Sequence, residues 1–142
     1  MKKILIVTGG SGGHVIPSLS IYDHLKDIYD TTLVTDLRGT KFINRNKYKY
    51  ILIDVPNIFS KLHLLPLNLL NFLLSIFKSY FFLRKKNINL IISTGGYMSL
   101  PLCIASRFLN IQIFLFEPNS VLGRANKFML GMSKKIICYD ID

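Results

Sequence analysis

Six short runs of consecutive apolar residues constrain the fold of this chain more than any other feature of its sequence. The apolar residues in these runs do not alternate with polar ones, which is typical of strands buried on both faces of a parallel sheet. We therefore expect strands at residues 3–8, 31–35, 50–55, 89–94, 112–116 and 135–139.

Helical patterning fills most of the intervals between these runs. The expected helices lie near residues 15–28, 63–86, 99–109 and 123–132. Pro17 and Pro101 fall where the first turn of a helix tolerates proline. Strands that alternate with helices predict an α/β fold with a doubly wound parallel sheet of the Rossmann kind. Residues 1–142 are enough for one domain with a full core.

The chain is strongly basic. Lys and Arg number 18 against 8 Asp and Glu, which gives a formal net charge of +10. Such a surface favours an anionic partner, either a phosphorylated substrate or an anionic lipid surface. The aromatic residues do not match an RNA-binding sheet motif, and the sequence has neither a zinc-finger nor a basic-zipper pattern, so we expect no nucleic acid partner.

The cysteines indicate a reducing compartment. Cys103 and Cys138 each lie in an apolar run, so we expect both to be core residues and not a disulfide pair. The apolar run that follows Lys3 is too short for a secretory signal, and we interpret it as the first strand.

Three loops that follow expected strands have unusual sequences. Ligands of a doubly wound sheet bind beyond the carboxyl ends of its strands, so these loops are the candidate ligand site. They read GGSGGH at 9–14, GGYMS at 95–99 and EPNSVLGRAN at 117–126.

The first loop contains more glycine than a tight turn requires. It is not a P-loop, because no Gly-Lys-Ser/Thr follows, and the dinucleotide fingerprint fails at Val15, where a third glycine belongs. Asp36 stands where an acidic residue would hold an NAD ribose, which leaves a dehydrogenase as a distant alternative. We favour a backbone that admits a sugar or a diphosphate at a helix N-terminus.

His14 stands at the end of this loop and is a candidate base, since imidazole accepts a hydroxyl proton near neutral pH. The second loop repeats the design with Gly95 and Gly96, and Tyr97 and Ser99 add hydroxyl groups. The two loops are expected to form opposing walls of a cleft; the plainer alternative for Tyr97 and Ser99 is simple loop geometry.

The third segment places Glu117 and Asn119 directly after a strand, where a carboxylate can act as a base or anchor a hydroxyl. Arg124 and Lys127 either face phosphate or are solvated helix positions, and the sequence does not decide between these. His24 and His63 are interpreted as surface or packing residues of helices.

Together the three segments resemble the MurG family of peptidoglycan glycosyltransferases. GGSGGHVIP at 9–17 is similar to the family's Gly-Gly-Thr-Gly-Gly-His-x-x-Pro loop, with Ser11 in place of threonine. GGYMSLP at 95–101 matches every fixed position of the second motif. FEPNSVLGRANK at 116–127 matches the third motif except that Phe116 replaces a histidine.

The resemblance implies the amino-terminal half of a GT-B glycosyltransferase. Such an enzyme moves GlcNAc from UDP-GlcNAc, with inversion, to the 4-hydroxyl of lipid I, the undecaprenyl-linked muramoylpentapeptide. It needs no cofactor and binds no metal through a DxD motif; DID at 140–142 has that form, and we interpret it as coincidence. Its expected location is the cytoplasmic face of the cell membrane, as a peripheral protein.

The resemblance also implies roles for individual residues. His14 is the candidate base on the acceptor hydroxyl, and Glu117 is a second catalytic candidate. The residues expected to contact UDP-GlcNAc are Ser11, Gly12, Gly13 and Asn119. Those expected to shape the site of the acceptor diphosphate are Gly10, Gly95, Gly96, Tyr97 and Ser99.

A long apolar and basic stretch separates two expected strands. Residues 62–83 are long enough to span a bilayer, but a spanning helix inserted there would disrupt the sheet. We favour an amphipathic or broken helix lying on an anionic membrane surface, over a spanning helix or a buried crossover helix. Residues 41–86 carry nine basic side chains and one acidic side chain, which supports this interpretation.

A MurG-like enzyme is about twice as long, and its second domain holds most of the nucleotide contacts. We therefore expect a carboxyl-terminal GT-B domain or subunit as a partner, with little turnover by this chain alone. The alternative is a non-catalytic, membrane-docking subunit that binds the acceptor in a split transferase.

Overall fold

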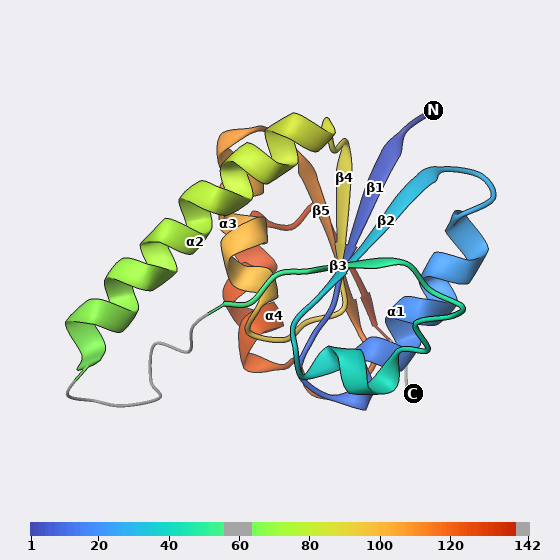
Figure 1. The fold of residues 1–142 in the computed structure, drawn as a ribbon, viewed down its shortest axis with the longest axis horizontal. Coiled ribbons are helices and arrows are strands. Elements are labelled where there is room, and N and C mark those ends of the chain that lie inside the picture. Colours follow the sequence, from blue (N-terminus) through green and yellow to red (C-terminus); the bar gives the residue numbers. More distant parts are fainter. Residues whose placement is uncertain (56–63, 139–142) are drawn as a thin grey trace.

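The computed structural model describes residues 1–55 and 64–138, and its strands form one parallel sheet in the order β3-β2-β1-β4-β5-β6 (Figure 1). The chain winds outward from β1 through β2 to β3, and then crosses back to β4 and winds the other way. This confirms the doubly wound sheet and places its switch point between β1 and β4. The strands are β1 (Lys3–Val7), β2 (Asp30–Thr35), β3 (Tyr50–Leu52), β4 (Leu90–Ser93), β5 (Gln112–Glu117) and β6 (Lys135–Cys138).

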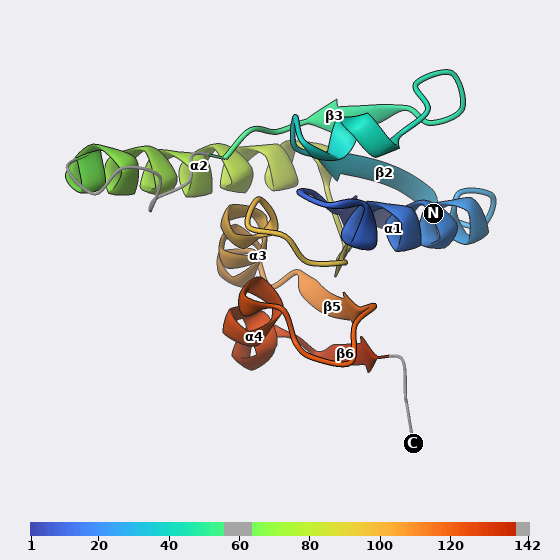
Figure 2. The same cartoon turned by 90° about the horizontal axis from the view of Figure 1, so that it is seen from below.

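Helices cover both faces of the sheet. Helix α1 and the short 3₁₀ segment η1 lie on one face, and α2, α3 and α4 lie on the other (Figure 2). A second 3₁₀ segment, η3, follows α4 directly. The bounds are α1 (Gly12–Leu25), η1 (Gly39–Phe42), α2 (Leu65–Lys86), α3 (Ser99–Phe108), α4 (Arg124–Met129) and η3 (Leu130–Met132).

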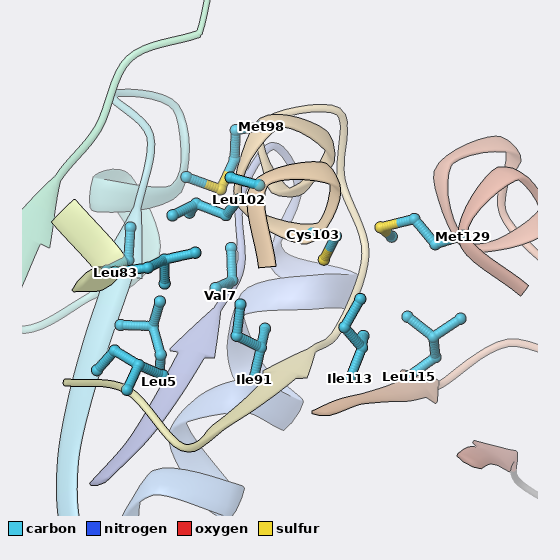
Figure 3. Packing of buried hydrophobic residues seen from close by; sticks show 13 residues of the cluster. Leu5, Val7, Leu83, Ile91, Met98, Leu102, Cys103, Ile113, Leu115 and Met129 are labelled. Carbon is cyan, nitrogen blue, oxygen red and sulfur yellow. The ribbon is translucent and has the colours of Figure 1, made fainter. Parts of the chain in front are cut away.

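Strand β1 is buried on both faces, as its unbroken apolar run predicts. Leu5 and Val7 point toward α3 and pack with Leu102 and Ile113 in the larger core cluster (Figure 3). Ile4 and Ile6, which alternate with them, belong to the smaller cluster beneath α1. Because the central strands are fixed from both sides, the loops at their carboxyl ends have a rigid base.

Helix α1 begins three residues earlier than the sequence pattern suggests. Ser11 is extended (φ −104°, ψ 160°) and serves as the N-cap, so Gly12 and Gly13 form the first turn. Pro17 is therefore the sixth helical residue, and the prediction that it lies in the first turn was wrong. Pro101, the third residue of α3, does lie in a first turn as expected.

Strand β6 departs from the expected burial. All four of its residues are exposed, because it is an edge strand with one neighbour, β5. Cys103 is buried, as predicted, but Cys138 is exposed, so its assignment to the core was wrong. Residue 139, which the sequence pattern included in this strand, lies outside the described residues, as does the DID segment at 140–142.

Helix α2 crosses from β3 to β4 and projects beyond the sheet (Figures 1 and 2). It is unbroken from Leu65 to Lys86 and stops at Asn87, whose left-handed conformation (φ 52°) caps it. In the described part of the chain it is the one helix long and apolar enough to cross a membrane, although such a helix is weak evidence of crossing. Only 17% of its most apolar stretch is buried, so a fully buried crossover helix is wrong.

The basic run predicted at 41–86 does not form one patch. The segment 39–49 lies near α1, on the opposite side of the molecule from the projecting half of α2 (Figures 1 and 2). Within it, Lys47 lies 3.2 Å from Asp23 of α1. The described cations on α2 are Lys78, Arg84, Lys85 and Lys86; Lys61 and His63 lie outside the described residues.

Candidate functional site

The two glycine loops meet at the switch point of the sheet. Gly10 has a φ of 84°, and Gly95 and Gly96 have φ values of 99° and 90°, a region that side chains other than glycine rarely adopt. Gly96 also packs directly on the main chain of Gly9. The loops after β1 and β4 are therefore in contact, as expected of two walls of one site.

A cleft of about 580 Å³ opens beside this contact. Its volume lies in the usual range for small-molecule sites, about 300–1,000 Å³. Its lining comes from α1, from the loop between β4 and α3, and from the start of α4. It includes His14, Gly95, Gly96, Tyr97, Arg124 and Asn126. The cleft therefore draws on all three of the sequence segments singled out above.

His14 faces this cleft and does not turn into the core. Its side chain is half-buried, and its ring lies so close to Gly95 that a Cβ atom there would be 3.1 Å from Nδ1. Nδ1 is buried and has no hydrogen-bond partner among the described residues. A buried ring nitrogen without a partner is costly, which marks this atom as one that a ligand or water satisfies.

Other buried polar atoms at this edge share the same property. Within residues 1–55 and 64–138, the buried side-chain atoms without a partner are Thr8 Oγ1, His14 Nδ1, Thr35 Oγ1, Thr94 Oγ1 and Asn126 Oδ1. Each belongs to the carboxyl end of a strand or to a helix that begins beyond that end. Of these five residues, His14 and Asn126 line the cleft.

Asp36 holds the first glycine loop in place. Its carboxylate accepts hydrogen bonds from the backbone N–H groups of Gly10 (3.0 Å) and Gly39 (2.8 Å), and it pairs with Arg38. Burial raises the pKa of Asp36, but these bonds more than offset it and hold the pKa below its ordinary value. An NAD ribose would have to displace these bonds, which argues against the dehydrogenase alternative.

Glu117 organises the third loop. Its carboxylate accepts four hydrogen bonds, from Asn119 N and Nδ2 (3.2 and 2.9 Å), Gly123 N (2.8 Å) and Asn126 Nδ2 (2.9 Å). Burial raises the pKa of Glu117, and the hydrogen bonds more than reverse that effect, so the pKa lies below its ordinary value. A buried carboxylate engaged in this way is suited to positioning the loop and poorly suited to accepting a proton.

Asn126 is a site residue that the sequence reasoning missed, since it was interpreted only as a helix boundary. Its amide nitrogen donates to Glu117 Oε2, which as a carboxylate can only accept. The orientation of the amide is therefore fixed, and its oxygen is left as a buried acceptor without a partner. Its place in the third motif, ten positions after Phe116, is the feature of the sequence that could have identified it as a site residue.

The structure places the remaining predicted residues in different surroundings. Tyr97 lines the cleft, and its ring lies 5.9 Å from that of Phe72 on α2. Ser99 is buried, and its hydroxyl donates to the Gly96 carbonyl (2.7 Å), so it shapes the loop. The residues expected to contact the donor lie outside the cleft lining; they are Ser11, Gly12, Gly13 and Asn119.

Arg124 lines the cleft from the start of α4, while Lys127 is exposed and does not. His24 is exposed on α1 and does not line the cleft. Its Nδ1 lies 2.8 Å from the carbonyl oxygen of Ser20 on the same helix. In the part of the chain that the structure describes, no group of three or more His, Cys, Asp or Glu side chains could hold a metal ion.

Residues 4–138 match the model of the glycosyltransferase family 28 N-terminal domain. The chain belongs to glycosyltransferase family 28. This assignment confirms the resemblance seen in the three motifs. The match begins at the second residue of β1 and ends at the last residue of β6.

Two curated relatives of this family 28 chain carry the same name. The chain is 54% identical over 138 residues to the UDP-N-acetylglucosamine–N-acetylmuramyl-(pentapeptide) pyrophosphoryl-undecaprenol N-acetylglucosamine transferase of Pelagibacter ubique, covering 97% of this chain and 39% of the relative. It is 39% identical to the protein of that name from Rickettsia typhi, covering 96% of this chain and 35% of the relative. The chain thus spans less than half the length of these relatives.

Solved structures show the same fold. MurG from Acinetobacter baumannii superimposes with a TM-score of 0.79 at 20% identity, over 99% of this chain and 42% of that chain. A UDP-GlcNAc 2-epimerase from Neisseria meningitidis, bound to UDP-GlcNAc, gives a TM-score of 0.66 at 10% identity, over 93% and 39%. The family 28 domain is therefore a Rossmann-like domain of the kind found in these larger proteins.

Proposed function

We propose that this family 28 domain is the acceptor-side half of an inverting glycosyltransferase of peptidoglycan synthesis. The reaction is transfer of GlcNAc from UDP-GlcNAc to the 4-hydroxyl of N-acetylmuramyl-(pentapeptide) pyrophosphoryl-undecaprenol, lipid I. The names of the relatives support this choice of substrates. The observation that carries it is the unpartnered, buried Nδ1 of His14 beside Gly95 at the wall of the cleft.

His14 is the proposed base. It takes the proton of the acceptor hydroxyl as that oxygen attacks the anomeric carbon of GlcNAc, and the bond from that carbon to the UDP oxygen breaks with its electron pair on the diphosphate. Attack from the face opposite the leaving group inverts the anomeric centre. A positioned base contributes about 10²–10⁴-fold to such a step.

The acceptor diphosphate is proposed to lie against the second glycine loop. Gly95 and Gly96 let the main chain come close to the ligand, and the dipole of α3, which begins at Ser99, adds partial positive charge at this end. Tyr97 and Arg124 border the same cleft. Ser11, Gly12, Gly13 and Asn119 stay as proposed contacts to UDP-GlcNAc, reached when a second domain closes over this edge.

Glu117 and Asn126 have positioning roles in this proposal. Glu117 cannot easily accept a further proton, because its oxygens already accept four hydrogen bonds. It orients Asn126 and leaves the Asn126 amide oxygen without a protein partner, as the proposed acceptor for a substrate hydroxyl or amide N–H. The replacement of the family's histidine by Phe116 leaves this arrangement in place.

The membrane is a further proposed partner, at its cytoplasmic face and in a peripheral mode. The projecting part of α2 exposes large apolar side chains, among them Leu67, Leu70 and Phe77. Four cations on the same helix, Lys78 and those at 84–86, add attraction to an anionic leaflet of about 1 kcal/mol each. The acceptor is lipid-linked, so the enzyme has to work at this surface.

Reconstitution tests the function. The chain is combined with the carboxyl-terminal remainder of the Pelagibacter ubique relative, and GlcNAc transfer to lipid I is measured. We expect transfer by the pair, little by either part alone, and a loss of about 10²-fold or more in His14→Ala. His24→Ala, on the exposed side of the same helix, is the matched control.

Two outcomes would contradict the proposal. The first is a reconstituted pair in which His14→Ala transfers at the unchanged rate. The second is a folded pair that binds lipid I but transfers nothing, which would leave the alternative of a non-catalytic acceptor-binding subunit in a split transferase.

A further inference from the structure

An apolar groove of about 660 Å³ runs between α2 and α3, separate from the cleft that contains His14. Its volume suits a bound small molecule. No charged side chain lines it, and apart from one tyrosine its walls are aliphatic or phenylalanine side chains. Leu73 of α2 and both Ile104 and Phe108 of α3 are among its walls.

The groove and the cleft are joined along one face of α3. Leu100 lines the cleft, whereas Ile104 and Phe108 line the groove. Residues four apart on a helix are surface neighbours, about 5–6 Å from Cβ to Cβ. These three side chains therefore form one apolar stripe that leads from the diphosphate side of the cleft into the groove.

Helix α2 provides a second connection. Phe72 is buried against Tyr97, a cleft residue, with ring centroids 5.9 Å apart. The next residue, Leu73, lines the groove. Helix α2 thus forms a wall of the apolar groove and, through Phe72, packs against Tyr97 of the cleft; Figure 2 shows α2 lying across α3.

The groove differs from the rest of the apolar surface of α2. Leu73 and its neighbour Leu74 are each 46% exposed, yet Leu73 faces the groove and Leu74 does not line it. A bilayer requires only a projecting apolar surface, which Leu74 and the residues near the start of α2 supply. A concave apolar groove that an apolar stripe links to the proposed diphosphate site favours a single chain attached to that diphosphate.

We propose that this groove binds the first isoprene units of the acceptor's undecaprenyl chain, so that one ligand occupies both hollows. The inference rests on the proposed function, because it takes the acceptor to be a sugar joined through pyrophosphate to a polyprenol. The groove then fixes the depth at which the diphosphate and its sugar stand in the cleft. Lipid-chain recognition becomes part of substrate positioning, distinct from attachment to the bilayer.

Binding of soluble prenyl diphosphate tests this directly. Farnesyl diphosphate and inorganic pyrophosphate are titrated by calorimetry into the chain. We expect farnesyl diphosphate to bind about tenfold more tightly or better, since burial of a few methylene groups is enough for one tenfold step. Leu73→Ser should lose most of this difference and leave pyrophosphate binding unchanged, while Leu74→Ser should retain it.

The alternatives give different results. If α2 only touches the bilayer, Leu73→Ser and Leu74→Ser will weaken binding to phosphatidylglycerol vesicles alike, and neither will change farnesyl diphosphate binding. If a second copy of the chain fills the groove, sedimentation will show a dimer that Leu73→Ser disrupts. Phe108→Ser, on α3 and 71% exposed, repeats the groove test from the other wall with little risk to folding.

Equal affinities of farnesyl diphosphate and pyrophosphate, or equal losses in Leu73→Ser and Leu74→Ser, would overturn the inference, as would a lack of farnesyl diphosphate binding. Those results would leave the proposed function intact, provided that His14-dependent transfer to lipid I is seen in the reconstituted pair. Absence of that transfer would instead remove the proposed function itself.

Discussion

A Cβ atom at position 96 would lie 2.7 Å from the carbonyl oxygen of Gly9, so the main chains of the two glycine loops are in direct contact. One loop follows β1 and the other follows β4, the two strands at the switch point of the sheet. This contact sets the spacing between α1, which carries His14, and the loop that carries Gly95. The shape of the cleft therefore depends on the absence of a side chain at position 96.

Gly96→Ala should destabilise the domain. The added methyl group meets backbone that cannot move aside, and a φ of 90° is itself unfavourable for alanine, a cost of about 1–3 kcal/mol before the clash is counted. Urea unfolding measures the loss. Gly131→Ala is the matched control, because a Cβ there meets nothing within 4 Å, and it should change stability by less than about 0.5 kcal/mol. Equal stability of the two variants would contradict the contact.

Asn126 should tolerate alanine better than aspartate. Asn126→Ala removes one donor from Glu117, which costs about 1–3 kcal/mol for a buried group. Asn126→Asp instead places a second carboxylate against Glu117 in a buried site, and like charges there are more costly. Unfolding in urea at neutral pH measures both variants. An aspartate variant as stable as wild type would show that Glu117 does not hold this amide.

Stability should fall in acid because of Glu117 and Asp36. Both groups have a pKa below the ordinary value in the folded chain, so each stabilises the fold above its ordinary pKa, near 4.5 for Glu117 and 3.8 for Asp36. This contribution is lost as the pH falls through the folded pKa. Glu117→Gln should be less stable than wild type at neutral pH and should lose less stability in acid. An unchanged acid dependence in this variant, measured by thermal unfolding, would contradict the hydrogen-bond pattern.

The two cysteines should react very differently. Burial raises the pKa of Cys103 to about 12, so its thiol is both shielded and protonated at neutral pH. Cys138, on the exposed edge strand, is open to solvent. A colorimetric disulfide reagent should modify one thiol per native chain and two after unfolding. Cys138→Ser removes the native reaction; rapid reaction in that variant would mean that Cys103 is not buried between α3 and the sheet.

The sequence predicted the sheet well where its strands lie in the middle. The runs that became β1 and β4 are buried on both faces, so their unbroken apolar pattern identified them. The same apolar pattern gave a wrong prediction of burial at β6, because it does not distinguish an edge strand from a central one. Cys138 was therefore assigned to the core, although it is exposed. The basic residues at 41–86 were predicted to form one surface. In the structure, those that precede β3 lie near α1, on the opposite side of the molecule from the projecting half of α2 (Figures 1 and 2).

The candidate site was predicted in outline and not in detail. His14, Gly95, Gly96 and Tyr97 do come together, because the carboxyl ends of β1 and β4 are neighbours. The roles of Glu117 and Asn126 could not be assigned from spacing. Whether a carboxylate is free or already bonded depends on where the loop folds back, here through the Gly123 amide.

The most direct measurement is the response of the His14 imidazole to a diphosphate ligand, followed by NMR of the ring nitrogens. Farnesyl diphosphate is titrated into the chain, and His24 on the same helix is the internal reference. We predict saturable shifts at the His14 ring and at the amides of Gly95 and Gly96, with His24 unmoved. Saturable binding that leaves His14 and both glycine amides unchanged would contradict the placement of the acceptor site in this cleft.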